Sequence, residues 1–493
     1  MNTFNKASKI TVTILLLALA LSLGACSSSQ NSVSPKDDSV TSSPISESET
    51  LPAAESQQGG NLSLITDPYG GIFRNGAGTS FGYYEIMSAQ NNSLNILYTD
   101  YATDIRTYLC ADPDCTHNSD TCTSWFSFLG SAYPFTSADG SKIYLVTTGY
   151  ADNAGSISDE QNYGTIYQFD ANGANRKVLY RLQSNEEFYG TAASDGEKLY
   201  VSIQVVDSNT SSSHWEVRCL DLSNGESSVI YTTDQYGERI FGAYDLYFDL
   251  YEINDSGNVT YQLWYVSFEN GTSEKVMDLG SDSDHYSLCD GANNELCFNH
   301  VSSDGISYCM YNPQSKTISD PFFVDSSVSG NSMIQDGYLF VLDEQASSVQ
   351  RIRLSDKEQA SASFTVKEGF GAPSMRYLFD GKLMITEAQT TASDIPTDGS
   401  YGVCSYILDF GTRNCTEFTL QTPYNNRPVY VLTTIGDTCY VATDYKTYTP
   451  TSVSEDGTVS NFDYVANIYA FITKQDYINS NQNGYSMVKD AFE

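Results

Sequence analysis

A short phrase recurs along the chain: an Asp-Gly turn followed at once by a strand of alternating apolar residues. Copies begin at Asp139-Gly140, Asp195-Gly196, Asp290-Gly291, Asp336-Gly337 and Asp380-Gly381, with a reversed Gly436-Asp437. Most copies start 44 to 56 residues after the one before, and the single step of 95 residues spans two units with a degraded copy near Tyr244 to Leu250. One such unit cannot bury its apolar face alone, so the repeats must stack on each other.

Each copy is followed by a second strand that ends in another turn. These second strands cover residues 167–170, 219–222, 264–267, 352–354, 406–409 and 468–471. Repeats of about 45–55 residues without a long amphipathic helix are typical of four-stranded propeller blades. The sequence therefore predicts an all-β fold over residues 61–493, a β-propeller of seven or eight four-stranded blades. A pair of stacked β-sandwiches is the alternative, although sandwiches need no phrase that recurs at this interval.

The N-terminal segment predicts export and lipid anchoring. Residues 1–25 carry two early lysines and then an apolar run from Ile10 to Leu23 that is too short to span a bilayer comfortably. The run ends in Leu-Gly-Ala-Cys, which resembles the lipobox of bacterial lipoproteins, so we expect Cys26 to be acylated after cleavage; an ordinary leader with a chance cysteine is the alternative. Residues 26–60 are rich in Ser, Thr, Pro and Glu and are expected to form a disordered tether. The predicted location is the extracytoplasmic face of the cell membrane, held by the lipid.

The charge of the chain limits its partners. It has 25 Lys and Arg against 61 Asp and Glu, a formal net charge of -36. Phosphate contacts would work against this field, so we expect no nucleic-acid partner. We expect a monomer that contacts the membrane only through its N-terminal lipid and whose ligand is a glycan, a peptide or an envelope protein.

The segment Leu109 to Cys122 gathers three cysteines and one of the four histidines. Cys110, Cys115, His117 and Cys122 would satisfy a tetrahedral structural zinc and leave no position open for catalysis. In an extended segment Cys115 and His117 point to the same side, and turns at Pro113 and at 118–120 would bring Cys110 and Cys122 back towards them. A disulfide with one leftover thiol and simple packing are the alternatives. In each case the segment is expected to staple a loop between the first two units.

Two further cysteine pairs are candidates for disulfides in an exported protein. Cys404 and Cys415 lie on either side of a turn, and Cys289 and Cys297 flank another. The other cysteines fall at similar positions in separate units, too far apart to bridge, and are predicted to be small buried apolar residues.

The pattern Leu-Cys-x-x-Pro-x-Cys-x-His-x-x-x-x-Cys, with the later Asp-Gly-x-x-Ile-Tyr and Ile-Tyr-x-x-Asp-x-x-Gly, resembles a group of uncharacterised lipoproteins of clostridia-type Gram-positive bacteria. These proteins are described as propeller-like and share a domain of unknown function. The resemblance implies a surface lipoprotein with a β-propeller. It implies no activity and provides no catalytic residues.

The sequence offers little catalytic chemistry. Gly78 to Gly82 matches the G-x-S-x-G pattern of a serine-hydrolase elbow, but a β-like segment follows it where the elbow needs a helix. The chain has no Walker phosphate loop and no H-E-x-x-H helix. We therefore assign no catalytic residue and expect a lipid-anchored binding or scaffold module rather than an enzyme. The alternative is an extracytoplasmic polysaccharide hydrolase or lyase, which converging carboxylates with shifted pKa values in the centre of the propeller would favour.

Overall fold

The computed structural model divides the chain into two units, Met1–Thr50 and Leu51–Glu493, and every described residue belongs to the second. The described residues are 63–64, 76–89, 93–127, 131–149, 163–207, 210, 212–234, 241–242, 246–253, 259–267, 273–281, 283–325, 332–344, 346–371, 373–388, 402–423, 426–448, 451–453, 459–461 and 464–491. The predicted leader, Cys26 and the tether lie outside them. Among the described residues no helix is long and apolar enough to cross a bilayer.

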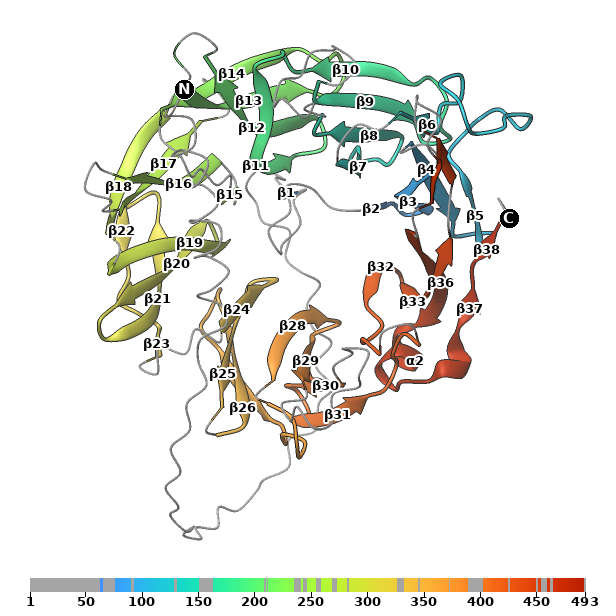
Figure 1. Ribbon diagram of the computed structural model, residues 1–493. Helices are drawn as coiled ribbons and strands as arrows, with labels where there is room; N and C mark the ends of the chain where they lie inside the picture. Colours follow the sequence, from blue (N-terminus) through green and yellow to red (C-terminus); the bar gives the residue numbers. More distant parts are fainter. Residues whose placement is uncertain are drawn as a thin grey trace. The chain divides into compact units, whose positions relative to one another are not determined.

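The first half of the second unit forms four blades of antiparallel strands in chain order, which we number blades 1 to 4 (Figure 1). Blade 1 is β2 (Gly76–Gly78), β3 (Gly82–Ser88), β4 (Leu94–Asp100) and β5 (Ile105–Tyr108), with β6 (Trp125–Phe126) paired to β4. Blade 2 is β7 (Ala132–Thr136), β8 (Lys142–Thr147), β9 (Thr165–Asp170) and β10 (Lys177–Arg181). Blade 3 is β11 (Glu186–Ser194), β12 (Lys198–Val206), β13 (Ser213–Asp221) and β14 (Ser227–Thr233), with β1 (Ser63–Leu64) added beside β11. Blade 4 is β15 (Phe241–Gly242), β16 (Leu246–Ile253), β17 (Val259–Val266) and β18 (Ser273–Ser281).

The second half forms four more blades. Blade 5 is β19 (Asp284–Ala292), β20 (Glu295–Ser302), β21 (Gly305–Asn312) and β22 (Thr317–Ile318), with β23 (Phe323–Asp325) paired to β21. Blade 6 is β24 (Ser332–Gln335), β25 (Tyr338–Asp343), β26 (Ser348–Arg353) and β27 (Gln359–Ser363). Blade 7 is β28 (Ser374–Phe379), β29 (Lys382–Ala388), β30 (Val403–Asp409) and β31 (Asn414–Phe418). Blade 8 is β32 (Val431–Ile435), β33 (Thr438–Tyr448), β36 (Tyr464–Thr473) and β37 (Ser486–Met487), with the hairpin of β34 (Thr451–Val453) and β35 (Val459–Asn461) between β33 and β36.

Two of the blades share a sheet, and a few short elements follow the strands of the last blade. Blades 4 and 5 share one continuous sheet, but β18 and β19 pair only at their joined ends, through Gly280 with His285 and Ser281 with Asp284. After β36 come α2 (Lys474–Ile478), the 3₁₀ turn η3 (Gln482–Gly484) and the final strand β38 (Lys489–Asp490).

The recurring Asp-Gly phrase marks the hairpin between the first and second strands of a blade. In blades 6 and 7 both turn residues have positive φ, 52° and 75° for Asp336 and Gly337, and 48° and 71° for Asp380 and Gly381. This is the two-residue hairpin whose twist matches that of the flanking strands, and Asp-Gly is a preferred sequence for it. In blade 5 the turn lies further on, at Asn293-Asn294, and the expected Asp290-Gly291 turn is instead the end of β19.

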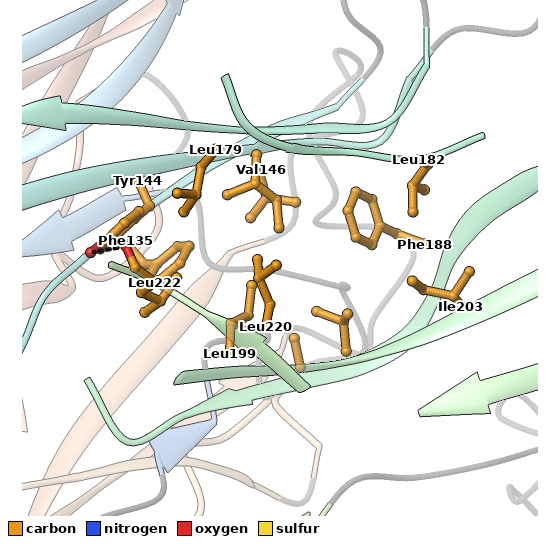
Figure 2. Packing of buried hydrophobic residues seen from close by; sticks show 13 residues of the cluster. Phe135, Tyr144, Val146, Leu179, Leu182, Phe188, Leu199, Ile203, Leu220 and Leu222 are labelled. Carbon is orange, nitrogen blue, oxygen red and sulfur yellow. Dashed lines mark hydrogen bonds between the residues drawn. The ribbon is translucent and has the colours of Figure 1, made fainter. Parts of the chain in front are cut away.

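Alternation along the second strands explains why each blade packs on both neighbours. In β8, Ile143 and Leu145 contact the core shared with blade 1, whereas Tyr144 and Val146 contact the core shared with blade 3. Successive side chains of a strand point to opposite faces, so one strand supplies two interfaces. In Figure 2, Phe135 and these two residues of blade 2 face side chains of blade 3, and the Tyr144 hydroxyl donates to the Leu222 carbonyl at 3.4 Å.

Eight buried clusters join each blade to the next, and the last of them closes the propeller. In that cluster Tyr83 of blade 1 packs with Tyr440, Tyr469 and Phe471 of blade 8. The fold is therefore a β-propeller of eight blades over the described residues, which confirms the predicted class at the upper blade count. The stacked-sandwich alternative is wrong, because each blade buries both of its faces, one against each neighbouring blade of the ring. The fourth unit, whose phrase is degraded, still forms a four-stranded blade.

Candidate metal centre

The cysteine- and histidine-rich segment leaves the last strand of blade 1 and returns to pair with blade 1 through β6. Leu109 is buried in the core between blades 1 and 2, and its carbonyl would lie 2.5 Å from a Cβ at Gly173, a turn residue of blade 2 with φ of 82°. Only a glycine fits this approach. The segment is thus held at both ends. It lies at the junction between the first two blades, as predicted from the sequence.

Cys110, Cys115, His117 and Cys122 converge on one point. One ligand atom from each, three Sγ atoms and an imidazole nitrogen, all lie within 4.8 Å of one another. His117 Nδ1 lies 3.4 Å from Cys122 Sγ. In a tetrahedral site with zinc–sulfur bonds of about 2.3 Å, neighbouring sulfurs are roughly 3.8 Å apart, so these donors are close to coordinating distance. The four residues could hold a metal ion.

Two turns produce this convergence. The Cys115 amide donates to the Asp112 carbonyl at 3.3 Å, while the Asp114 amide donates to the Asp112 side chain at 3.0 Å. The Cys122 amide donates to the Ser119 carbonyl at 3.0 Å. Both turns were expected from the residues that favour them, Asp-Pro-Asp and Asn-Ser-Asp. They bring the two outer cysteines back to the central pair.

The central pair has a different conformation from the one expected. His117 has a φ of 55°, so the backbone turns there and does not run extended from Cys115. The His117 amide also donates to Cys115 Sγ at 3.4 Å. A left-handed histidine costs of order 1 kcal/mol or more and persists only where its surroundings enforce it. The expectation of an extended pair was wrong, because a local turn and not strand alternation places the two donors together.

The protonation of the cluster follows from its partial burial. Burial lowers the pKa of His117, which favours the neutral imidazole that binds metals. Burial also raises the pKa of the Cys122 thiol, to about 12, and a hydrogen bond with Cys115 acts in the same direction. Burial acts to raise the pKa of Cys110 too, but hydrogen bonds with its neighbours, first with the Asp112 backbone, outweigh it and the pKa is lowered. The thiols of Cys110 and Cys122 therefore have pKa values shifted in opposite directions although both belong to one cluster.

Residues outside the segment hold it in place, and sequence reasoning missed them. The buried Asn95 of β4 donates through Nδ2 to the His117 carbonyl at 3.1 Å, and the His117 ring stacks on Tyr108 with centroids 4.4 Å apart. Arg176, in the hairpin between β9 and β10 of blade 2, donates to the carbonyls of Asp120 at 2.8 Å and Cys122 at 3.0 Å. No sequence pattern marks Asn95 or Arg176, since each contact spans a long stretch of chain.

None of the ten cysteines among the described residues forms a disulfide in this structure. The predicted bridge between Cys404 and Cys415 is wrong: Cys415 pairs with Leu408, four residues along β30 from Cys404, or roughly 13 Å at the rise of a strand. That exceeds the Cα separation of a disulfide, about 7 Å at most. Cys289 lies at a bulge beside Asp290, the partner of Cys297, and its thiol donates to the Ser287 carbonyl at 3.4 Å. Cys297 is fully buried in the core between blades 5 and 6.

The G-x-S-x-G segment is a hairpin and not an elbow before a helix. It joins β2 to β3, and the Thr79 amide donates to the Gly82 carbonyl at 2.8 Å. Gly82 and the next residues continue as a strand. This agrees with the exclusion of Ser80 as a nucleophile.

Comparisons with known proteins add little. No protein-family profile matches the chain, and no curated protein does. Among solved structures, an oligogalacturonate lyase in complex with manganese is 14% identical, with 67% of this chain and 96% of the other covered and a TM-score of 0.36. The β-propeller domain of the trilobed protease from Pyrococcus furiosus is 12% identical, with 68% and 94% covered and a TM-score of 0.35. At TM-scores this low the likeness carries no argument about what this chain binds or does.

Proposed function

We propose that this protein is a lipid-anchored extracytoplasmic binding module whose eight-bladed propeller is stapled by a structural zinc ion. The observation that supports the zinc is the convergence of the four donors of Cys110, Cys115, His117 and Cys122 within 4.8 Å. Three sulfurs and one imidazole suit zinc, and four protein ligands complete its tetrahedron. Such a site has no open position for a substrate or an activated water, so its role is structural.

The zinc would cross-link a loop that is held by side-chain contacts and by its two ends but not by strand pairing. Residues 109 to 122 contain no strand, and their contacts to the blades come from a few side chains such as Asn95 and Arg176. A metal that binds only the folded loop adds its binding free energy to folding. The junction between blades 1 and 2 would be the part of the molecule that gains most, because Arg176 of blade 2 donates to the loop directly.

The membrane location and the binding role come from the sequence. The lipobox-like Leu-Gly-Ala-Cys supports acylation of Cys26, and the low-complexity residues after it support a tether. The net charge of -36 disfavours nucleic acid. The protein would act as a monomer at the cell surface, and its ligand would be a glycan, a peptide or an envelope protein.

One observation favours the alternative, an extracytoplasmic polysaccharide hydrolase or lyase. Burial raises the pKa of Asp290 to about 6, and the nearby Asp336 contributes. Partial desolvation also raises the pKa of Asp336, although that residue is exposed overall. Two neighbouring carboxyls with raised pKa values are a feature of acid–base sites, but carboxyls with a purely structural role can also have shifted pKa values. Release of reducing ends from a polysaccharide by the purified protein would support this alternative, provided that replacement of Asp336 abolishes the activity.

Intact mass and metal content of the full-length protein, produced in a bacterial host and purified in detergent, test the proposal. We expect about one zinc per chain, lost in Cys115→Ser and in His117→Ala, and a mass that corresponds to an acylated chain beginning at Cys26. Cys219→Ser is the matched control, because Cys219 is a half-buried free cysteine outside the cluster, and it should keep the zinc. A chain without metal whose mass is two hydrogens short would make the cluster a disulfide. An unprocessed or unacylated chain would contradict the anchor.

A further inference from the structure

A cavity of about 1000 Å³ lies where the first strands of blades 6, 7 and 8 approach each other. Its walls come from β24, β28 and β32, with Lys474 at the start of α2. In Figure 1 these three strands face the middle of the propeller. Its volume is within the range of ligand pockets, and four blades, 2 to 5, lie between it and the metal centre along the chain.

The charges of the cavity are balanced in an otherwise strongly acidic protein. Two cations, Arg376 and Lys474, line it together with two carboxylates, Asp336 and Asp380. Lys474 Nζ lies 3.5 Å from Asp380 Oδ1, and Arg376 Nε donates to Thr386 Oγ1 at 2.6 Å, which fixes the plane of the guanidinium. An anionic ligand would meet both carboxylates and the net charge of -36, and a cationic ligand would meet both cations. This set of groups suits an uncharged ligand that both donates and accepts hydrogen bonds.

Two tyrosines give the same cavity an aromatic wall. The rings of Tyr377 and Tyr430 have centroids 5.6 Å apart and are inclined by 56°. Tyr430 remains 37% exposed. The Tyr377 hydroxyl is 2.5 Å from that of Tyr477, which donates to the Val429 carbonyl at 2.7 Å, so Tyr377 is held from behind. A partly exposed ring beside a fixed one offers two apolar faces to a ligand without a large loss of side-chain entropy.

The walls are also tied to each other. Gln335 at the end of β24 accepts a hydrogen bond from the Leu378 amide of β28 at 2.7 Å. A side-chain amide that reaches the neighbouring first strand fixes the spacing of blades 6 and 7 at the cavity. The cavity is therefore largely preformed, which reduces the cost of binding.

We propose that this cavity binds an uncharged oligosaccharide, with Tyr430 and Tyr377 packing against the apolar faces of sugar rings and Arg376 and Asp336 hydrogen-bonding to hydroxyls. A sugar hydroxyl donates to a carboxylate and accepts from a guanidinium, so it can hydrogen-bond to both kinds of charged group in the cavity. An anionic or a cationic ligand would be repelled by one of the two. Its C–H face packs on the electron-rich face of an aromatic ring. The inference rests on the proposed binding function and names its ligand class.

The test is isothermal titration of the full-length protein in detergent with maltohexaose, cellohexaose, xylohexaose, mannohexaose and chitohexaose, and with hexagalacturonate as the anionic comparator. We expect at least one neutral hexasaccharide to bind more tightly than hexagalacturonate. Tyr430→Ala and Arg376→Gln should each weaken that binding roughly tenfold or more. Leu432→Ala is the matched control for the tyrosine: Leu432 lies on β32, two residues after Tyr430, and is 38% exposed, but does not line the cavity. Arg351→Gln, on the third strand of blade 6, is the control for the arginine.

Three results would overturn the inference: no heat with any neutral hexasaccharide at millimolar concentration, tighter binding of hexagalacturonate, or equal weakening by Tyr430→Ala and Leu432→Ala. Zinc content and acylation measured on the same preparation separate this failure from failure of the proposed function. A zinc-loaded, acylated protein that binds none of the sugars would still be an anchored module, with another ligand class.

Discussion

Two of the eight blade interfaces are built from different chemistry. Between blades 2 and 3 the buried cluster consists mainly of apolar side chains, among them the fully buried Val146, Leu199 and Ile203 (Figure 2), and the hydrogen bonds that cross this interface involve uncharged acceptors such as the Leu222 carbonyl. At the interface between blades 8 and 1, where the propeller closes, blade 1 carries a buried ion pair: Arg106 Nε of β5 lies 2.7 Å from Glu85 Oε1 of β3, with side chains only 3% and 10% exposed. Apolar burial stabilises without direction, whereas a buried ion pair is stable only in a precise geometry.

The closing interface contains further directional contacts. The hydroxyl of Tyr469 in blade 8 donates to the Glu85 carboxylate, and Arg106 donates to the Asn467 carbonyl at 3.0 Å. The last strand, β38, runs parallel to β5 and places Asp490 opposite Arg106. Consecutive blades are already brought together by the loops that connect them, but blades 1 and 8 come from opposite ends of the sequence that forms the propeller. The comparison teaches that the interface without a short connection adds a buried ion pair of fixed geometry to its apolar contacts.

The largest effect should follow from breaking the buried ion pair. Arg106→Met leaves Glu85 without its cation in the closing interface and is expected to reduce the free energy of unfolding by about 4 kcal/mol, since an unpaired buried charge keeps its desolvation cost. Urea unfolding followed by tyrosine and tryptophan fluorescence measures the change. Lys275→Met is the control, because its pair with Asp278 is solvent-exposed, and a loss of at most about 1 kcal/mol is expected there. Equal losses in the two variants would show that the closing interface does not depend on its ion pair.

A somewhat smaller loss should follow from opening a space in the apolar interface. Leu199→Ala removes three carbons from a fully buried position between blades 2 and 3 and is expected to cost about 3 kcal/mol in the same unfolding experiment. Val178→Ala, at a residue that is 45% exposed on blade 2, should change stability by no more than about 0.5 kcal/mol. If Leu199→Ala cost more than Arg106→Met, the apolar interfaces would be the more demanding ones and the comparison would reverse.

The interface between blades 5 and 6 sharpens the comparison, because it places a carboxyl beside an apolar core. Asp290 accepts from the Gly291 amide at 2.8 Å, and burial raises its pKa to about 6. The folded protein therefore binds the carboxyl proton of Asp290 more tightly than the unfolded chain does. Its contribution to stability is present below about pH 4 and is lost as the pH rises to about 6. Asp290→Asn should therefore equal the wild type near pH 4 and exceed its stability at pH 7 by about 1–2 kcal/mol.

Asp139 occupies the same place in the repeated phrase and provides the opposite sign. It is exposed, and hydrogen bonds, first from Ser137, lower its pKa to about 2. Its contribution is present above the usual pKa of an aspartate and is lost as the pH falls towards 2. Unfolding curves of Asp139→Asn and Asp290→Asn from pH 3 to 7 should diverge in opposite directions from the wild type. Parallel curves would mean that the two positions are electrostatically alike.

The local parts of this molecule could be predicted from the sequence. Asp336-Gly337 and Asp380-Gly381 form the hairpins that their residue types favour, and the turns at Asp112 and Ser119 lie where they were expected. The convergence of Cys110 and Cys122 on the central pair follows from those turns. The conformation of His117 could not be predicted, because its positive φ is maintained by Asn95 and Tyr108 from neighbouring strands. The pairing of Cys404 with Cys415 failed for a similar reason, since hairpin register depends on the whole sheet.

The sequence by itself determined the repeat, the alternation within strands and the donor set of the candidate metal centre, because each depends on residues within a few positions of one another. The tertiary structure alone decided that there are eight blades, how the propeller closes and where the cavity lies. Glu85 and Tyr469 are 384 residues apart in the chain, and three blades contribute to the cavity around Tyr430. Contacts of that separation depend on how all the intervening blades stack, and no local pattern records this.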